Sequence, residues 1–269
     1  GVGLGAAILT EGTLVRGSRG FAGEITHAVT DPAAARRAGA AAGRRHDPLA
    51  GSLLGQLSEL GLLSPGAVAS LARIVNNCSS SAWLIPDATT AKLDPFFAHP
   101  TISLVCSVFD PITKQPYSRD PRHIAKKAEA YLRQSGIADT AFMGPEAEFF
   151  LFDDVRFDHS KPNEGYYFLD SKEGAWNSGT KEGPNLGYKT RYKEGYFPVP
   201  PTDTLAGIRQ EMMLMLQATG ITVEVGHHEV ATGGQCEIGF KFDKLLPCAD
   251  NLLWFKYVIK NIARKNGKA

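Results

Sequence analysis

The stretch HHEVATGGQCEIGF, residues 227–240, decides how this chain can fold. Two short runs with apolar residues flank the small residues ATGG, a pattern typical of antiparallel strands joined by a turn. Glu229 and Glu237 then face each other across that turn. Two carboxylates that converge repel each other unless a cation lies between them. The stretch therefore predicts a strand pair that carries a metal site, with further ligands supplied by other segments.

Length and charge restrict the class of protein. The 269 residues suffice for one large domain or two small ones, and 29 basic residues balance 28 acidic ones. A formal net charge of +1 argues against a broad surface for nucleic acid or anionic membrane. No run of 18 apolar residues occurs, and the four cysteines form no CxxC pair. We expect a soluble, cytoplasmic protein with reduced thiols and with neither a nucleic-acid nor a membrane partner.

The first part of the chain changes composition twice. Residues 1–32 are rich in glycine, and their short apolar runs indicate strands joined by tight turns. Residues 33–82 form an Ala/Arg-rich linker or a pair of marginal helices. Beyond them, residues 101–110 predict one buried strand, and residues 120–136 predict a helix that Asp120 caps.

The second half alternates strand pairs with helices. The pattern predicts a helix over residues 202–220, strands over 221–230 and 234–243, and a helix from Ala249 to about Lys265. The stretch between residues 160 and 195 is polar and rich in glycine. This order of elements predicts an α+β fold rich in antiparallel strands and disfavours a doubly wound parallel sheet.

A second pair of carboxylates lies in GPEAEFF, residues 144–150. Residues two apart in a strand project from the same face, so Glu146 and Glu148 lie side by side. An exposed strand edge with solvated glutamates is the alternative. The apolar flanks favour an interior strand, in which ionised carboxylates need compensation by cations.

Together the two stretches bring four carboxylates and two adjacent imidazoles, those of His227 and His228, into one candidate site. Oxygen-rich sets of this kind suit hard cations such as Mg²⁺ or Mn²⁺, the usual partners of nucleotide phosphates. A metal ion there would polarise a phosphoryl group and neutralise charge as it moves. For the two histidines, a hydrogen-bonded role in the core or at its rim is an equal alternative.

Six segments after residue 83 form an ordered series. They are IPDATTAKLDPFF (85–97), GPEAEFFLFDD (144–154), EGAWNSG (173–179), GYFPVPPTD (195–203), HHEVATGGQCEIGFKFD (227–243) and KYVIKNIARKNGK (256–268). In order and spacing they resemble successive motifs of bacterial type I glutamine synthetase. The resemblance implies an ATP-dependent ligase that phosphorylates the side-chain carboxylate of glutamate and lets ammonia displace the phosphate. Glutamate, ammonia and ATP are then the substrates, and Mg²⁺ or Mn²⁺ the metal.

The resemblance also implies a role for each carboxylate. Glu148, Glu229 and Glu237 match the ligands of the metal ion on the glutamate and ammonia side. Glu146 matches a ligand of a second metal ion that serves the ATP phosphates. The reading from the residues and the reading from the family therefore agree on four metal-binding carboxylates.

Two further positions match the nucleotide site of that family. Glu224 matches a nucleotide-binding position, and Phe242 matches the aromatic residue that packs on adenine. Tyr196 lies in a segment near the active site of the family, without an assigned role. One departure precedes the histidines, because Gly226 stands where the family usually has a first histidine.

The resemblance implies a domain layout as well. Residues 83–110 match a remnant of the N-terminal β-grasp domain, and residues 111–269 match the N-terminal part of the catalytic domain. Members of the family assemble into double rings of identical subunits. The chain lacks the family's upstream segment with an ammonium-site aspartate and its downstream metal ligands and arginines. We therefore expect a homo-oligomer with impaired assembly, truncated at both ends and inactive by itself.

A different resemblance covers residues 1–32, GVGLGAAILTEGTLVRGSRGFAGEITHAVTDP. This segment is similar to the centre of the ROK family of sugar kinases and repressors, in which a Gly-rich hairpin cradles phosphate. Glu24 and His27 match the sugar-binding pair of that family, whereas its zinc motif and catalytic aspartate do not occur. Two alternatives to the ligase stay open: a ROK-type sugar kinase or repressor, and a non-catalytic chimeric fragment that only binds a divalent metal.

Overall fold

A computed structural model describes most of the second half of the chain and parts of the first. The described residues are 8–10, 13–15, 26–29, 82–99, 101–177, 187 and 189–269. The chain divides into two compact units, residues 1–141 and 142–269. None of the helices described is long and apolar enough to cross a membrane. The domain boundaries expected from the sequence stay predictions.

Two predicted features of the first residues lie wholly or partly outside the described ranges. The linker over residues 33–82 is described only at Ala82. Glu24 lies outside the described residues, and only the backbone of His27 is described. The sugar-binding interpretation of these two residues therefore stays a prediction.

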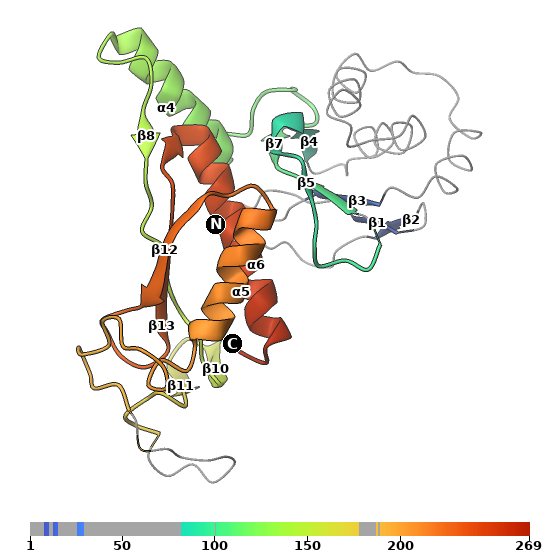
Figure 1. The fold of residues 1–269 in the computed structure, drawn as a ribbon. Coiled ribbons are helices and arrows are strands. Elements are labelled where there is room, and N and C mark those ends of the chain that lie inside the picture. The colour runs from blue at the N-terminus through green and yellow to red at the C-terminus, as the bar shows by residue number, and fades with distance from the viewer. Residues whose placement is uncertain are drawn as a thin grey trace. The chain divides into compact units, whose positions relative to one another are not determined.

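The first unit contains a five-stranded sheet in the order β2-β1-β3-β6-β5 (Figure 1). The strands are β1 (Ile8–Thr10), β2 (Thr13–Val15), β3 (Thr26–Val29), β5 (Lys92–Leu93) and β6 (Thr101–Leu104). β1 pairs with β2 in antiparallel and with β3 in parallel orientation, and β6 is antiparallel to both β3 and β5. Every residue of β6 is buried, which fits its place between two other strands.

The apolar run at residues 101–110 forms two strands, so the prediction of one strand was wrong. β6 ends at Leu104, and β7 (Cys106–Phe109) pairs in a separate sheet with β4 (Trp83–Pro86). Val105 separates them because its backbone bonds elsewhere. Its N–H donates to Thr90 Oγ1 at 2.8 Å, and its carbonyl accepts from the N–H of Asp87 at 3.0 Å. These partners lie in and before the short 3₁₀ helix η1 (Ala88–Thr90), which the hydrophobic pattern does not reveal.

Helix α4 (Pro121–Ser135) confirms the helix predicted over residues 120–136. The Asp120 carboxylate accepts from the N–H of Arg122 at 3.0 Å, and Pro121 occupies the first turn. Gly136 ends the helix with φ 71°, in the left-handed region that glycine adopts without strain. The second oxygen of Asp120 accepts from the N–H of Val108 at 3.1 Å, which fixes the helix start against β7.

The second unit is built on a three-stranded sheet in the order β12-β13-β9. Its elements are β8 (Phe142–Met143), β9 (Glu148–Phe150), β10 (Asp154–Lys161), β11 (Glu164–Asp170), α5 (Ala206–Ala218), β12 (Val223–His228), β13 (Gln235–Phe240), β14 (Asp243–Lys244) and α6 (Leu245–Lys265). β12 and β13 are antiparallel, which confirms the predicted strand pair. α5 begins four residues later and α6 four residues earlier than predicted. Helices and largely antiparallel strands together confirm the α+β fold.

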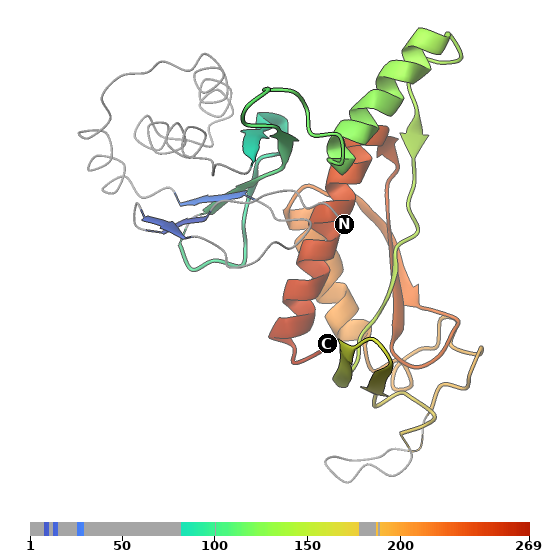
Figure 2. The same cartoon turned by 180° about the vertical axis from the view of Figure 1, so that it is seen from behind.

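The core of the second unit lies between this sheet and the two helices, which run side by side (Figures 1 and 2). Met212 and Leu216, one turn apart on α5, are fully buried, as is Ile238 of β13. From α6, the Phe255 ring packs edge-on against Phe149 of β9, with ring centroids 6.2 Å apart. The apolar faces of both helices therefore fix the side of the sheet that faces the core.

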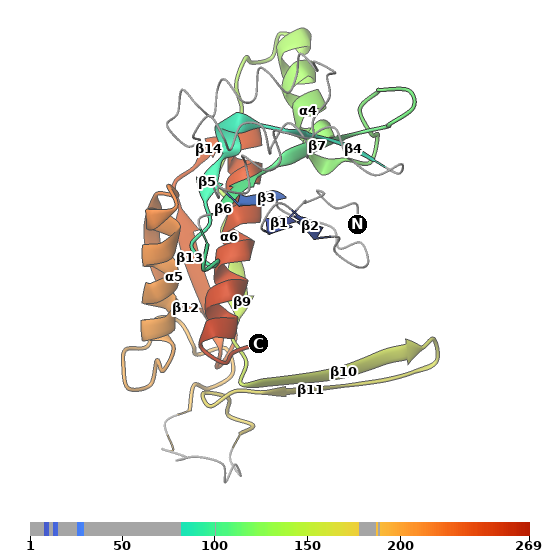
Figure 3. The ribbon, with the colours of Figure 1, turned by 90° about the vertical axis from the view of Figure 1, so that its right-hand side faces the viewer.

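β10 and β11 form a long antiparallel ribbon that extends away from the three-stranded sheet (Figure 3). The polar stretch predicted at residues 160–195 is therefore partly strand. The neighbouring residues Tyr166 and Tyr167 project from opposite faces of the ribbon, and both are exposed. Neither face of the ribbon is therefore buried, and its sequence has no apolar side. A hydrophobic pattern of period two cannot reveal a ribbon of this kind.

Candidate metal centre

Three side chains at one end of the β12–β13 pair form the candidate metal centre. His227, Glu229 and Glu237 each offer a ligand atom, and these atoms all lie within 4.8 Å of one another. His227 Nδ1 lies 3.5 Å from Glu229 Oε1, and His227 Nε2 lies 3.6 Å from Glu237 Oε2. Glu229 is buried and the other two are half-buried. The convergence of Glu229 and Glu237 predicted from the sequence is thus present.

The sheet register explains this convergence. His227 of β12 stands directly opposite Glu237 of β13, and Glu237 stands directly opposite Glu148 of β9. Directly paired residues project from the same face of a sheet. The three side chains therefore form one row across three strands, and Glu229 follows at the end of β12.

Glu148 is held by a hydrogen bond from the neighbouring strand. Gln235 Nε2 donates to Glu148 Oε2 at 2.6 Å, and Gln235 Oε1 accepts from the N–H of Ala231 at 2.6 Å. Gln235 is buried, with 6% of its surface exposed. The amide therefore links the turn after β12 to the carboxylate on β9 and sets the direction of that carboxylate.

The setting of the GPEAEFF segment differs from the interior strand that was favoured. β9 starts only at Glu148 and is an outer strand of its sheet as described. Glu146 and Glu148 are exposed, while Ala147 and Phe149 between them are half-buried. The alternation of faces is as predicted, but the burial is not, because β9 pairs on one side only, with β13, among the strands that the structure describes.

The charges of three neighbouring carboxylates act on the pKa of the fourth, Glu237. Burial raises the pKa of Glu237 above its ordinary value, and the negative charges of Glu229, Glu148 and Glu146 raise it further, while His227 opposes them. A divalent cation among these groups would reverse that repulsion, since it favours the ionised form of every carboxylate. The donor set of carboxylate oxygens with one imidazole fits a hard divalent cation such as Mg²⁺ or Mn²⁺.

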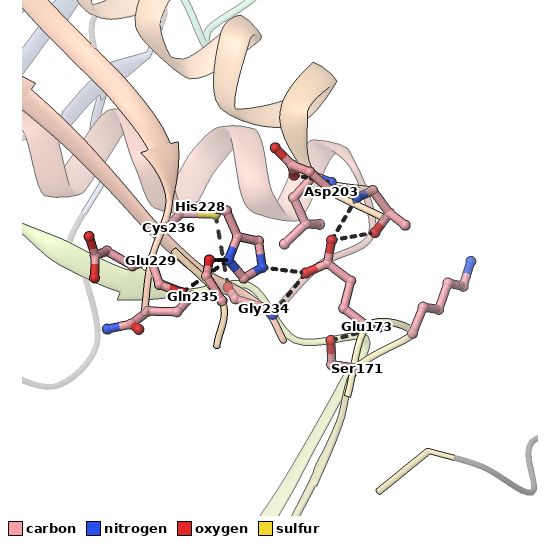
Figure 4. A network of polar contacts seen from close by, with 12 residues as sticks. Ser171, Glu173, Asp203, His228, Glu229, Gly234, Gln235 and Cys236 are labelled. Atoms are coloured by element: carbon pink, nitrogen blue, oxygen red, sulfur yellow. Dashed lines mark hydrogen bonds and ion pairs between the residues drawn. The ribbon is translucent and has the colours of Figure 1, made fainter. Parts of the chain in front are cut away.

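The two adjacent histidines serve different faces of the sheet, because neighbouring strand residues alternate. His227 faces the carboxylates, whereas His228 is fully buried on the other side (Figure 4). His228 Nε2 lies 2.9 Å from Glu173 Oε2, and His228 Nδ1 lies 2.7 Å from the carbonyl oxygen of Gly195. Burial alone would lower the pKa of His228, but the Glu173 carboxylate raises it above its ordinary value. The hydrogen-bonded role in the core thus applies to His228, while Nδ1 of the half-buried His227 lies 3.2 Å from the carbonyl oxygen of His228.

Tyr196 lies at the margin of the metal centre. The N–H of Phe197 donates to the carbonyl of His228 at 3.1 Å, and the N–H of Lys193 donates to that of Ala231 at 2.7 Å, so this segment runs beside the turn. The Tyr196 ring lies edge-on to His227, with centroids 5.4 Å apart, and 54% of the residue is exposed. A hydroxyl-bearing ring therefore borders the cluster.

Glu224 and Phe242 lie at the opposite end of the β12–β13 pair. Glu224 is exposed where the register of the pair shifts, between Val223 and Val225. Phe242 is 56% exposed and packs edge-on against Phe142, with centroids 5.7 Å apart. His227 is the nearest residue of the cluster and lies three residues after Glu224, which at about 3.3 Å per residue of extended chain is roughly 10 Å. The structure does not bring these two residues into the cluster.

The glycine that replaces a histidine before the cluster has a packing reason. A Cβ at Gly226 would lie 2.5 Å from Met213 Sδ on helix α5. The Met213 side chain thus occupies the space that a larger residue at position 226 would need. Glycine at position 226 thus leaves room for the Met213 side chain of helix α5, which packs on β12.

Sequence reasoning missed Glu173 and Gln235, which hydrogen-bond to His228 and to Glu148 next to the cluster. Glu173 is 1% exposed and lies in the EGAWNSG segment, 55 residues before its partner His228. Only its resemblance to a family motif singled out the EGAWNSG segment, and no periodicity or charge pattern points from it to β12. Contacts of that sequence separation become visible only in the folded chain.

Comparison with known proteins adds an independent finding. Residues 118–269 match the family model described as "Glutamine synthetase, catalytic domain". Glutamine synthetase of Microchaete diplosiphon is 57% identical over 189 residues, which cover 70% of this chain and 40% of that protein. Glutamine synthetases of Frankia alni and Streptomyces coelicolor are also 57% identical, with the same coverage. The chain spans about 40% of the length of these relatives.

A solved structure agrees with this result. The chain superposes on Plasmodium falciparum glutamine synthetase with a TM-score of 0.61 and 28% sequence identity. The match covers 72% of this chain and 39% of that one. The resemblance of residues 1–32 to the ROK family stays a prediction, because these comparisons show nothing for that segment.

Proposed function

This chain belongs to the glutamine synthetase family, and on that premise we propose that it forms part of an ATP-dependent ligase that joins glutamate and ammonia. The side-chain carboxylate of glutamate is first phosphorylated by ATP, and ammonia then displaces phosphate to give glutamine. The convergence of His227, Glu229 and Glu237 carries the proposal, because phosphoryl transfer depends on neutralising charge at such a site.

In this proposal the carboxylates bind divalent cations. Glu148, Glu229 and Glu237 hold one ion, and Glu146 contributes to a second one beside the ATP phosphates. Either Mg²⁺ or Mn²⁺ suits these ligands, and the bound ion neutralises the phosphoryl charge. The row of paired positions across β12, β13 and β9 supports the assignment, since it brings Glu148 next to Glu237.

The nucleotide would lie along the β12–β13 pair. Phe242 offers an exposed ring on which adenine can stack, and Glu224 offers a carboxylate for the ribose hydroxyls. These residues mark one end of the strands, and the cluster of carboxylates marks the other. A nucleotide that extends between the two ends would place its phosphates beside the metal centre.

The test of the proposal is metal binding by the Glu229→Ala variant. We expect wild-type protein to bind Mn²⁺ at the cluster, and the substitution to abolish that binding because it removes a ligand and one negative charge. Water-proton relaxation during Mn²⁺ titration measures the bound ion. Glu164→Ala, at the exposed tip of the β10–β11 ribbon, is the matched control and should bind as wild type does. Equal relaxation in wild type and Glu229→Ala would contradict the proposed site.

The remaining expectations from the family belong to the same proposal. Self-association into a homo-oligomer follows from the resemblance, and sizing chromatography of the same sample measures it. The sugar-kinase alternative is not favoured, because the relatives found are glutamine synthetases.

A further inference from the structure

We propose that Glu173 is a positioning residue for the metal centre, whose buried carboxylate clamps the turn that carries Glu229. The inference rests on the proposed function, because it concerns the same metal site. Glu173 does not touch the cluster itself. It acts through the backbone and through His228, and so sets where Glu229 stands relative to Glu237.

The Glu173 carboxylate has four hydrogen-bond partners and is 1% exposed (Figure 4). Oε1 accepts from the N–H of Thr204 at 2.6 Å and from its hydroxyl at 2.9 Å. Oε2 accepts from the N–H of Gly234 at 2.9 Å and lies 2.9 Å from His228 Nε2. Bonds of this kind to an ionised acceptor are stronger than neutral ones, so the group has one well-defined position.

A single oxygen thereby holds both ends of one turn. His228 is the last residue of β12, and Gly234 is the residue before β13. Oε2 of Glu173 contacts both, and Glu229 lies between them. Other bonds also hold the turn, such as that from the N–H of Ala231 to Gln235 Oε1, but this carboxylate oxygen contacts its first and last residues together.

Close packing makes the clamp specific to this backbone. A Cβ at Gly233 would lie 2.5 Å from the backbone carbonyl carbon of Glu173, so the two backbones are in direct contact. The other nitrogen of His228 lies 3.0 Å from the carbonyl oxygen of Glu229. The imidazole thus connects Glu173 directly to the residue that offers the metal ligand.

The test replaces Glu173 by glutamine, which keeps the shape but puts an NH₂ group against the N–H of Thr204 or of Gly234. We expect the affinity for Mn²⁺ to fall by about 10–100-fold, the usual loss when a group behind a metal ligand is changed. The EPR spectrum of bound Mn²⁺ should also change its line shape, since Glu229 moves relative to the ion. Mn²⁺ titration and thermal unfolding are measured on the same samples.

A matched control separates positioning from general stability. Trp254→Phe removes a hydrogen bond of 2.8 Å from Trp254 Nε1 to Thr219 Oγ1, which lies on the helical side of the unit. This control should lower the melting temperature and leave the Mn²⁺ affinity and line shape unchanged. Loss of affinity in both variants would overturn the proposal, because Glu173 would then act through stability alone.

The outcomes also separate this inference from the proposed function. Wild-type protein that binds no Mn²⁺ would overturn both. Wild-type binding with Glu173→Gln within twofold of it would overturn the positioning role and leave the metal site intact. Should Glu173→Gln not fold, Thr204→Val removes one donor to Oε1 and keeps the side-chain shape. We then expect a loss of several-fold, and an unchanged affinity in that variant would refute the inference.

Discussion

Gln235 offers the sharpest test of how the metal centre is built. Its side chain donates to Glu148 and accepts from the backbone of Ala231. The substitution Gln235→Ala removes both hydrogen bonds and leaves the backbone ladder of β13 in place. We therefore expect weaker metal binding with the fold retained.

The size of the effect follows from the two bonds. A hydrogen bond to a charged acceptor contributes about 1.5–3 kcal/mol, and one between neutral groups about 0.5–1.5 kcal/mol. The first of these orients Glu148, so its loss should appear in metal affinity as a decrease of about 10–100-fold. The second bond holds the turn, so its loss should appear mainly in the free energy of unfolding.

Isothermal titration with Mn²⁺ measures the affinity, and urea unfolding measures the stability. Gln217→Ala is the control, because it makes the same change at an exposed position of helix α5. We expect the control to match wild type in both measurements. A Gln235→Ala protein that binds Mn²⁺ within twofold of wild type would refute the idea that Gln235 orients Glu148.

Two further predictions concern the groups behind the cluster. Arg209 forms a buried ion pair with Asp203 at 2.5 Å. Arg209→Met leaves the Asp203 carboxylate unpaired and should lower the free energy of unfolding by about 3–5 kcal/mol. The double variant Arg209→Met/Asp203→Leu removes that unpaired charge and should regain part of the lost stability. Equal urea midpoints for the single and double variants would refute this. Burial raises the pKa of Cys236 to about 11, so about one thiol in a thousand is ionised at pH 8, and the thiolate fraction rises with pH. Peptide mapping after iodoacetamide treatment should find Cys236 unmodified in folded protein and alkylated in urea; modification of the folded protein at pH 8 would contradict the prediction.

Local patterns predicted much of the fold, because they depend on neighbouring residues. The cap at Asp120 and the glycine at its far end defined helix α4 almost to the residue. The small residues between Glu229 and Glu237 defined the β12–β13 turn and brought these carboxylates together. Both features are encoded in short stretches of neighbouring residues.

Features that depend on distant partners could not be predicted. The break at Val105 exists because Asp87 and Thr90 take its backbone hydrogen bonds. The exposure of Glu148 depends on where β9 lies in the sheet, which no local pattern states. Family resemblance pointed to these segments, but only the folded backbone shows which neighbours each one has.

The row formed by His227, Glu237 and Glu148 limits how this segment can vary in length. A strand that gains or loses a single residue ahead of such a position turns every following side chain to the opposite face. An insertion of one residue early in β13 would turn Glu237 toward the apolar core, although every functional residue would still be present in the sequence. Insertions and deletions are therefore tolerated at the exposed tip between β10 and β11, whereas within β9, β12 and β13 they would disrupt the metal centre.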